Sequence, residues 1–419
     1  MKIHISDTNA CKALFFSISF FVGLWAVRIP DIKDQIEVDY TGMGYLFVIF
    51  SIGSVLTMIV APKITQLYSS KKISLMSGFI ISVLWLLIPF AQSFEFMALL
   101  SFIFGVCYGL FEVILNVQAT SLEKKFNKPM MSGFHAFWSI GLLSGSLLTS
   151  LFLEFKISFF INSIVFVAIL APVIFFSSLT IKNNKSDSLS FFSIFFNWPL
   201  FLIVLFVLAV TAVFLEGGTD SWGSLYMRDY INADGFNIGL AAIAFNGSMV
   251  FGRLIGDKLK EIFGIYNFLV LSVIGSLVGS IIIALSSSLT LAVIGFIVAG
   301  FSVSSIIPIC YTFGSSIENV NPTVGITIIT IGVYGVFMIA PPALGYVADI
   351  FGIEFVYTPM LILFLMASMI VIMQKKLYRV EQCYFRKGQN NFYQKNGQHI
   401  LAKLRGVRSG ILMGISFLI

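Results

Sequence analysis

The chain has 419 residues, of which 58% are hydrophobic and only 11% are charged, and its formal net charge is +6. Because a soluble domain carries about a quarter charged residues, this composition excludes a soluble globular protein and indicates that lipid is the solvent. The positive charge does not indicate a nucleic-acid-binding protein, since nine of the 26 Lys and Arg residues fall within 375–408. We expect that basic stretch to contact anionic lipid headgroups.

Twelve apolar runs are long enough for an α-helix to cross the hydrocarbon core, which takes about 20 residues. They lie at about 13–29, 42–61, 73–90, 95–118, 133–153, 157–177, 199–217, 238–255, 266–285, 289–313, 323–347 and 355–373. The longest polar interruption falls between the sixth and seventh runs. It divides the chain into a first half at 1–180, a linker at 181–198, a second half at 199–378 and a basic tail at 379–419.

The distribution of basic residues predicts the orientation of these spans. If the N-terminus is cytoplasmic, only four of the 26 Lys and Arg residues fall in outer loops, namely Arg28, Lys33, Lys156 and Arg228. Cytoplasmic loops of membrane proteins carry an excess of Lys and Arg. We therefore expect an inner-membrane protein with both termini in the cytoplasm.

Span four carries an acid where charge is costly. Glu112 lies about 18 Å of helix rise before Lys124, which places its carboxyl in the hydrocarbon region. A charged residue at the centre of a span costs about 2.5–3.5 kcal/mol, so such a group protonates, pairs or faces a water-filled cavity. Asn116 lies one turn further along the same face, and Gln118 adds polarity nearby. An acid beside an amide suits a hydroxyl-rich ligand.

Span seven ends in two further acids, Glu216 and Asp220, which are four residues apart on one helix face. Two charged carboxylates at this spacing repel each other, which favours proton uptake by one of them. The structural alternative is that Asp220 is a solvated residue at the mouth of a cavity or a helix cap.

Several other residues have one functional and one structural interpretation. Arg28 either lies at the membrane surface or pairs with an acid such as Asp31, or else it clamps the substrate or acts as the counter-charge to Glu216. His135 either packs by a hydrogen bond or serves in proton transfer or gating. Trp25 and Trp222 either stack on a sugar face or anchor the chain at the interface. Asn246 and Tyr334, polar residues within spans eight and eleven, are further substrate-binding candidates.

Glycines and prolines predict where helices approach or bend. Gly105 and Gly109, Gly141 and Gly145, and Gly275 and Gly279 are pairs of small residues that allow close helix packing. Pro341 and Pro342 predict a break in span eleven, because proline removes a backbone donor.

Several of these stretches resemble the Major Facilitator Superfamily, in its fucose permease-like branch and a bacterial group related to the rhizopine transporter. The resemblance rests on GLFEVILNVQATSLE (109–123), MMSGFHAFWSIG (130–141), LEGGTDSWGSLYMRD (215–229) and GVYGVFMIAPPALGYVAD (332–349). It implies an all-α membrane protein whose twelve transmembrane helices form two pseudo-symmetric six-helix bundles, with a solute site near midplane between them. The segment after span eight resembles the cytoplasmic loop signature of that superfamily. This resemblance implies a cytoplasmic latch formed by Gly252, Arg253, Gly256 and Asp257.

The resemblance assigns proton coupling to an acid on span four, which Glu112 matches, with Asn116 as its companion amide. The span-one acid of the fucose–proton symporter has no match, because residues 13–27 contain no acid and Arg28 follows them. Glu216 is an alternative source of that acid.

We therefore expect a secondary transporter for a small polar solute, such as a sugar or a cyclitol, that works as a monomer by proton symport. The expected energy source is the proton gradient, with no cofactor and no bound metal. A proton-antiport exporter is the main alternative, although SIGLLSGSL (139–147) lacks the proline that many such antiporters carry. An enzyme or a non-transporting sensor is a remote alternative, since the sequence has no nucleophile motif, phosphate loop or soluble domain.

Overall fold

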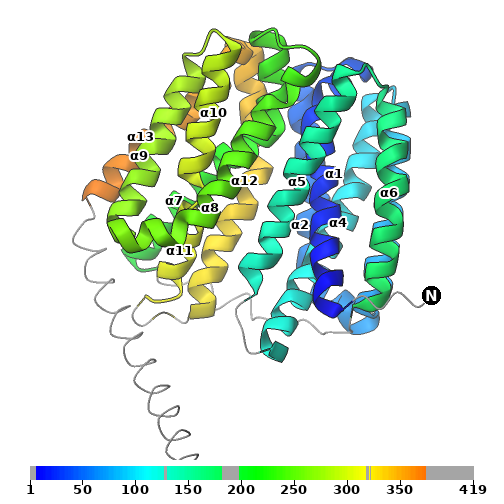
Figure 1. The fold of residues 1–419 in the computed structure, drawn as a ribbon, viewed down its shortest axis with the longest axis horizontal. Helices are drawn as coiled ribbons and strands as arrows, with labels where there is room; N and C mark the ends of the chain where they lie inside the picture. Colours follow the sequence, from blue (N-terminus) through cyan, green and yellow to red (C-terminus); the bar gives the residue numbers. More distant parts are fainter. Residues whose placement is uncertain (1–5, 127–129, 182–197, 318–319, 321, 374–419) are drawn as a thin grey trace, which may run out of the picture.

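The structure is a computed structural model that describes residues 6–126, 130–181, 198–317, 320 and 322–373. Within these residues, twelve helical segments are long and apolar enough to cross a membrane, as the sequence predicts. They form two bundles that stand side by side (Figure 1). The predicted linker, except for its first and last residues, and the basic tail lie outside the described residues.

Each bundle contributes six spans. The first bundle consists of α1 (Asp7–Gln35), α2 (Tyr40–Leu67), α3 (Ser70–Leu87), α4 (Phe94–Phe126), α5 (Met131–Glu154) and α6 (Phe159–Thr180). The second consists of α7 (Leu200–Leu225), α8 (Leu240–Phe263), α9 (Ile265–Ala284), α10 (Leu289–Val303), α11 (Ile306–Gly314), α12 (Pro322–Phe351) and α13 (Thr358–Met373). Here α10 and α11 together make the tenth span.

Short polar connections set the helix starts. Asp39, Ser69 and Ser158 each accept a hydrogen bond from the backbone N–H three residues later, at the beginnings of α2, α3 and α6. Such N-caps satisfy backbone donors that a helix cannot satisfy internally. These helices therefore begin within a few residues of the apolar runs that predict them.

The predicted glycine pairs bring helices of one bundle together. A Cβ atom at Gly105 of α4 would lie only 2.0 Å from the carbonyl oxygen of Phe50 in α2, and Gly109 faces Ser54 of α2. Gly141 and Gly145 pack in the same way against α1. Without a hydrophobic driving force in lipid, this close backbone contact stabilises helix pairing.

Two expectations about the eighth and tenth spans are wrong. The stretch 252–263 is the end of α8 rather than a loop, and the helix stops at Gly264, whose φ of 77° favours glycine. The tenth span, expected as one helix, is interrupted between α10 and α11 at Ser304 and Ser305.

The expected break at Pro341 and Pro342 is also wrong, because α12 continues through both prolines. Proline at 341 leaves the Phe337 carbonyl, four residues earlier, without its helical donor. The hydroxyl of Ser51 in α2 donates to that carbonyl at 2.9 Å. Gly44 of α2 gives the prolines room, since a Cβ there would lie 2.8 Å from the Pro342 Cα. Residues of the other bundle thus accommodate the proline pair.

Polar contacts join the bundles at one end, where α1 finishes and α2 begins. The Arg228 guanidinium of the π-helical turn η3 (Tyr226–Tyr230) donates to Asp34 at 2.6 and 3.1 Å. The Tyr40 hydroxyl donates to Asp229 at 2.9 Å. Asp349, at the end of α12, accepts the backbone N–H groups of Tyr40 at 3.0 Å and of the next residue at 2.6 Å. We call this the closed end.

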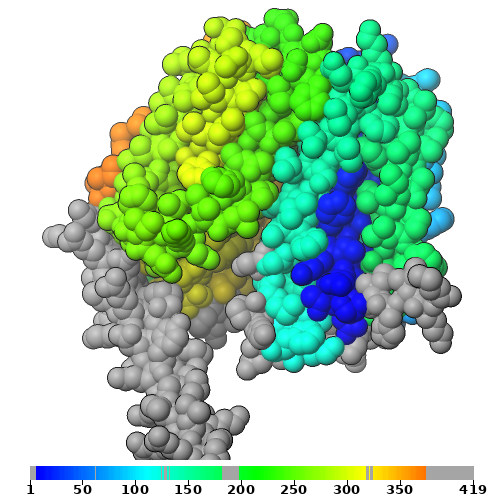
Figure 2. Space-filling model, in the orientation of Figure 1, coloured from blue at the N-terminus to red at the C-terminus, as the bar shows by residue number. Residues whose placement is uncertain are grey.

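The opposite end is hollow. Figure 2 shows the two bundles in contact at the top of the view and separated by a recess at the bottom, on the side where α1 and α5 begin. We call this the open end. The bundles also meet along their length, where α2 packs against α12, α5 against α8 and α1 against α7.

Candidate functional site between the two bundles

Glu112 lies where the two bundles face each other. It is in α4, and its Oε1 atom accepts a hydrogen bond from the hydroxyl of Tyr334 in α12. Its Oε2 atom is buried and has no hydrogen-bond partner. A buried polar atom without a partner is costly, so such atoms mark places that a ligand, a proton or water can complete.

Two further tyrosines belong to the same surroundings. Tyr108 precedes Glu112 by one turn of α4 and is close enough to interact electrostatically with Glu112 and Asp220. Tyr311 of α11 interacts in this way with Glu112 and Glu216, and its hydroxyl accepts from Thr330 at 3.3 Å. We call Tyr108, Tyr311 and Tyr334 the tyrosine cluster. It combines apolar rings with hydroxyl groups, as ligand pockets commonly do.

The other two predicted acids lie on α7 and have separate partners. Asp220 accepts a hydrogen bond from the Asn246 amide of α8 at 3.0 Å. Glu216 forms a long ion pair of 3.7 Å with Arg253 of α8. The side chains of Glu216 and Arg253 are 25% and 33% exposed, so this pair borders accessible space rather than a sealed core.

Arg253 belongs to this site rather than to a loop latch. Its guanidinium also donates to the Ser139 hydroxyl of α5 at 2.9 Å, so Arg253 connects the two bundles. The other latch residues lie differently: Gly252 and Gly256 pack against Ser304 and Ser305 at the interruption of the tenth span. Asp257 is 91% exposed and pairs with Lys260 at 2.5 Å.

Arg28 lies apart from the inter-bundle site. It is 3% exposed and pairs with Asp31 at 2.9 Å, as one of its two sequence interpretations expects. Its remaining donors bind Asn162 at 3.0 Å and the Ile157 carbonyl at 2.9 Å, which ties α1 to α6 and the turn before it. These three contacts, one from each nitrogen of the guanidinium, all lie within the first bundle.

The remaining candidates have local contacts. Asn116 donates to the backbone carbonyl of Glu112 at 3.0 Å, so its amide nitrogen is engaged within α4. Gln118 is buried. Trp222 is fully buried and contacts the rings of Tyr40 and Phe47 near the closed end. Trp222 belongs to α7 and both of those rings belong to α2, so Trp222 is part of the contact between the bundles.

Trp25 and His135 lie in the first bundle. The Trp25 ring packs edge-on against Phe47 and Trp85. His135 is exposed near the start of α5, toward the open end, and its ring contacts Phe15 edge-on with centroids 5.5 Å apart. Neither makes a contact with Glu112 that would identify it as a proton partner in this conformation.

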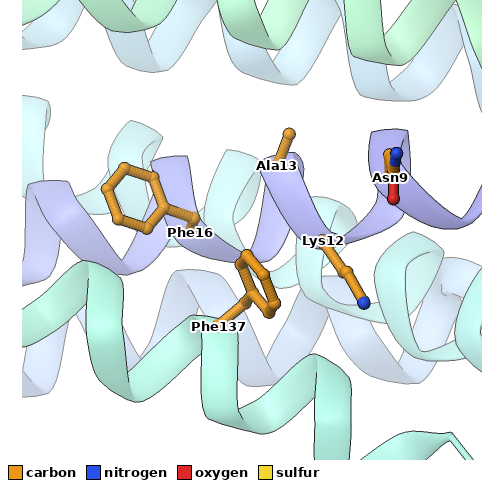
Figure 3. Close-up of a pocket in the computed structure, with 5 residues that line it drawn as sticks. All are labelled: Asn9, Lys12, Ala13, Phe16 and Phe137. Atoms are coloured by element: carbon orange, nitrogen blue, oxygen red, sulfur yellow. The ribbon is translucent and has the colours of Figure 1, made fainter. Parts of the chain in front are cut away.

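A different pocket of about 410 Å³ lies on the first bundle, between α1 and α5 (Figure 3). Its lining consists of Asn9, Lys12, Ala13, Phe16 and Phe137, and the Lys12 ammonium lies 5.1 Å from the Phe137 ring centroid. This mostly apolar lining offers a polar solute few partners. Within the described part of the chain, no cluster of His, Cys, Asp and Glu side chains could hold a metal ion.

The sequence does not predict three of the residues found at this site: Tyr108, Tyr311 and Ser139. Tyr108 precedes Glu112 by four residues, and that spacing could have placed it on the same helix face. Tyr311 and Ser139 come from helices remote in sequence, and a single sequence gives no signal for such pairs.

Comparison with known proteins places this geometry in a family. A family model described as the Major Facilitator Superfamily matches residues 13–317. An uncharacterized MFS-type transporter of Yersinia pestis is 27% identical over 353 residues, which cover 83% of this chain and 90% of that protein. Membrane protein MosC of Rhizobium meliloti is 24% identical over 343 residues, covering 81% and 83%.

Solved structures agree on the fold. The crystal structure of the nucleoside transporter NupG matches with a TM-score of 0.68 at 13% identity, over 89% of this chain and all of that chain. Identity this low carries the fold but not the substrate. The resemblance expected from the sequence is confirmed: the chain belongs to the Major Facilitator Superfamily and is a multi-pass membrane transporter.

Proposed function

We propose that the protein is a secondary active transporter that moves a small polar solute, of a sugar-like or cyclitol-like kind, together with a proton. Membership of the family establishes membrane transport of a small molecule in a lipid environment. The observation that carries the proton-coupled part is the carboxyl of Glu112, which lies between the bundles with one oxygen held across the interface and one without a partner.

The proposed cycle follows from this geometry. A proton binds Glu112 and the solute binds its site from the same side, while the bundles are open there. Protonated Glu112 carries no charge. The intermediate in which the bundles are closed at both ends therefore does not bear the desolvation cost of a carboxylate. Opening to the other side exposes the group to water, and the proton and the solute leave. Alternating access of this kind is a rocking of one bundle against the other around a fixed site.

Two pairs of polar residues support solute binding in this proposal. Asn246 donates to Asp220, and Glu216 is held loosely by Arg253. Because this ion pair is long, at 3.7 Å, Glu216 and Arg253 can each leave the other and bind a solute hydroxyl instead. Tyr108 contacts the ring of Trp138 edge-on at 6.2 Å and supplies an apolar wall of the kind that sugar faces stack on.

The distribution of charge supports an orientation in the membrane. With basic segments on the cytoplasmic side, the closed end would face outward and the open end inward. We place the protein in the inner membrane as a monomer, with both termini in the cytoplasm and the proton gradient as its energy source.

The proposal is tested with purified protein in two steps. Thermal unfolding is first measured with sugars, cyclitols and amino sugars, and a bound solute raises the unfolding temperature by mass action. The solute that gives the largest rise is then followed into proteoliposomes with an imposed pH gradient. Symport predicts accumulation on the alkaline side. Accumulation on the acidic side would instead identify a proton-antiport exporter, and no response to the gradient would refute proton coupling.

A further inference from the structure

The hydrogen bond between Tyr334 and Glu112 joins the two bundles. Glu112 belongs to α4 of the first bundle and Tyr334 to α12 of the second. The other carboxyl oxygen of Glu112 has no partner. Among the described residues, the hydrogen bond made to this carboxyl therefore comes from the opposite bundle.

Among the side chains that the structure describes, none near Glu112 is a cation that could replace the Tyr334 donor. The titratable groups that face it are the tyrosine cluster, with Asp220 and Glu216 beyond. Arg253 is occupied by Glu216 and Ser139. The helices α1, α2 and α3 carry their charged residues near their ends, and α5 carries His135 near its start and Glu154 at its end. The Tyr334 hydroxyl is thus the group that stabilises the charged form of Glu112 here.

We propose that Tyr334 is the positioning residue through which the proton on Glu112 controls the contact between the two bundles, an inference that rests on the proposed proton symport. A carboxylate gains more from a donated hydrogen bond than a neutral carboxylic acid does. Charged Glu112 therefore favours the conformation in which Tyr334 reaches it. Protonation weakens that preference and releases α12 from α4.

The same bond acts in the other direction. When the bundles separate at this site, Glu112 loses its donor, and the charged form becomes less stable than it is here. Separation then favours proton binding, because coupling between a proton and a conformation is reciprocal.

The expected strength of this coupling follows from the bond. A hydrogen bond to a charged group contributes about 1.5–3 kcal/mol, which corresponds to about 1–2 pH units. The ratio of the two conformations should therefore change by about 10- to 100-fold between the pH at which Glu112 is charged and the pH at which it is neutral.

The experiment needs no solute, because the proton is the probe. Spin labels are placed at Phe155 and Phe355, exposed positions on opposite bundles near the closed end, in a chain without other cysteines. The distribution of distances between the two labels is recorded by electron–electron double resonance from pH 5 to pH 9 in the full-length protein. Tyr334→Phe removes the hydroxyl, and Tyr266→Phe is the control, because its hydroxyl joins α9 to Val371 of α13 within one bundle.

We expect the wild-type ratio to change steeply with pH, the Tyr266→Phe ratio to follow it, and the Tyr334→Phe ratio to stay nearly constant. A steep response in Tyr334→Phe would overturn the inference and leave the proposed function intact. A flat response in the wild type would overturn the proposed proton coupling and the inference with it. If Tyr334→Phe does not fold, Glu112→Asp replaces it, since the shorter acid withdraws from Tyr334 and should give the same flat response.

Discussion

The contact between Asp349 and α2 gives a quantitative test of how the bundles are held together. Asp349 of the second bundle accepts two backbone N–H groups at the start of α2 in the first bundle, at 3.0 and 2.6 Å. It acts as a helix cap supplied across the interface. Replacing it by Ala removes both hydrogen bonds and a negative charge near the positive end of the α2 dipole.

The magnitude follows from the separate contributions. Loss of a side-chain N-cap costs about 0.5–2 kcal/mol, and loss of a charge near an exposed helix terminus costs about 0.3–1 kcal/mol. Because Asp349 is exposed, we take about 1–2 kcal/mol in total. A change of this size alters the ratio of two conformations about 5- to 30-fold. Since the cap exists only while the bundles touch, Asp349→Ala should raise the proportion that is open at the closed end.

The control is Asp39→Ala, because Asp39 caps the same helix from its own bundle, accepting from Gly42 N–H at 2.7 Å. That change weakens α2 in both conformations and should lower the unfolding temperature without changing their ratio. The assay is the distance distribution between labels at Phe155 and Phe355. An unchanged distribution in Asp349→Ala, or an equal shift in Asp39→Ala, would contradict this prediction.

Two further predictions concern packing. Gly105→Ala should lower the unfolding free energy by about 1–3 kcal/mol, because its Cβ would collide with the Phe50 carbonyl oxygen. Denaturation in detergent measures this change, and an unchanged denaturation midpoint would contradict the prediction. Gly133→Ala is the matched control, since its Cβ would meet nothing within 4 Å. Ser51→Ala should favour separation of the bundles by roughly 5-fold, because the Phe337 carbonyl loses a hydrogen bond worth about 1 kcal/mol. The same label pair measures this, and a distance distribution identical to wild type would exclude it.

The number and position of the spans were predictable because membrane insertion depends on local composition. Each apolar run corresponds to a span in the structure. Helix continuity was less predictable. The effect of Pro341 depends on Ser51, which lies far away in sequence on the other bundle. The break near Ser304 accompanies close packing with Gly252 of α8. Both depend on contacts between helices, which no local pattern encodes.

The site was predictable in part for a related reason. A carboxyl within an apolar run is costly wherever it lies, so Glu112 stands out without knowledge of its partners. Placing a tyrosine within a span has no comparable energetic cost, so the sequence distinguishes Tyr334 only as a polar residue within a span. The segment that contains Arg253 resembles a loop in the sequence, whereas in the structure it continues α8 to Phe263, and Arg253 pairs with Glu216. Identifying such partners requires knowing how the bundles face each other.

In the proposed mechanism, Glu112 carries the proton that drives solute accumulation. The most direct test of this role is Glu112→Gln in proteoliposomes, with the solute identified by thermal unfolding. Glu95→Gln, in the first turn of α4, is the control. We expect Glu112→Gln to exchange solute across the membrane yet fail to concentrate it under a pH gradient, while Glu95→Gln behaves as the wild type. Accumulation against a gradient by Glu112→Gln would show that Glu112 does not carry the coupled proton.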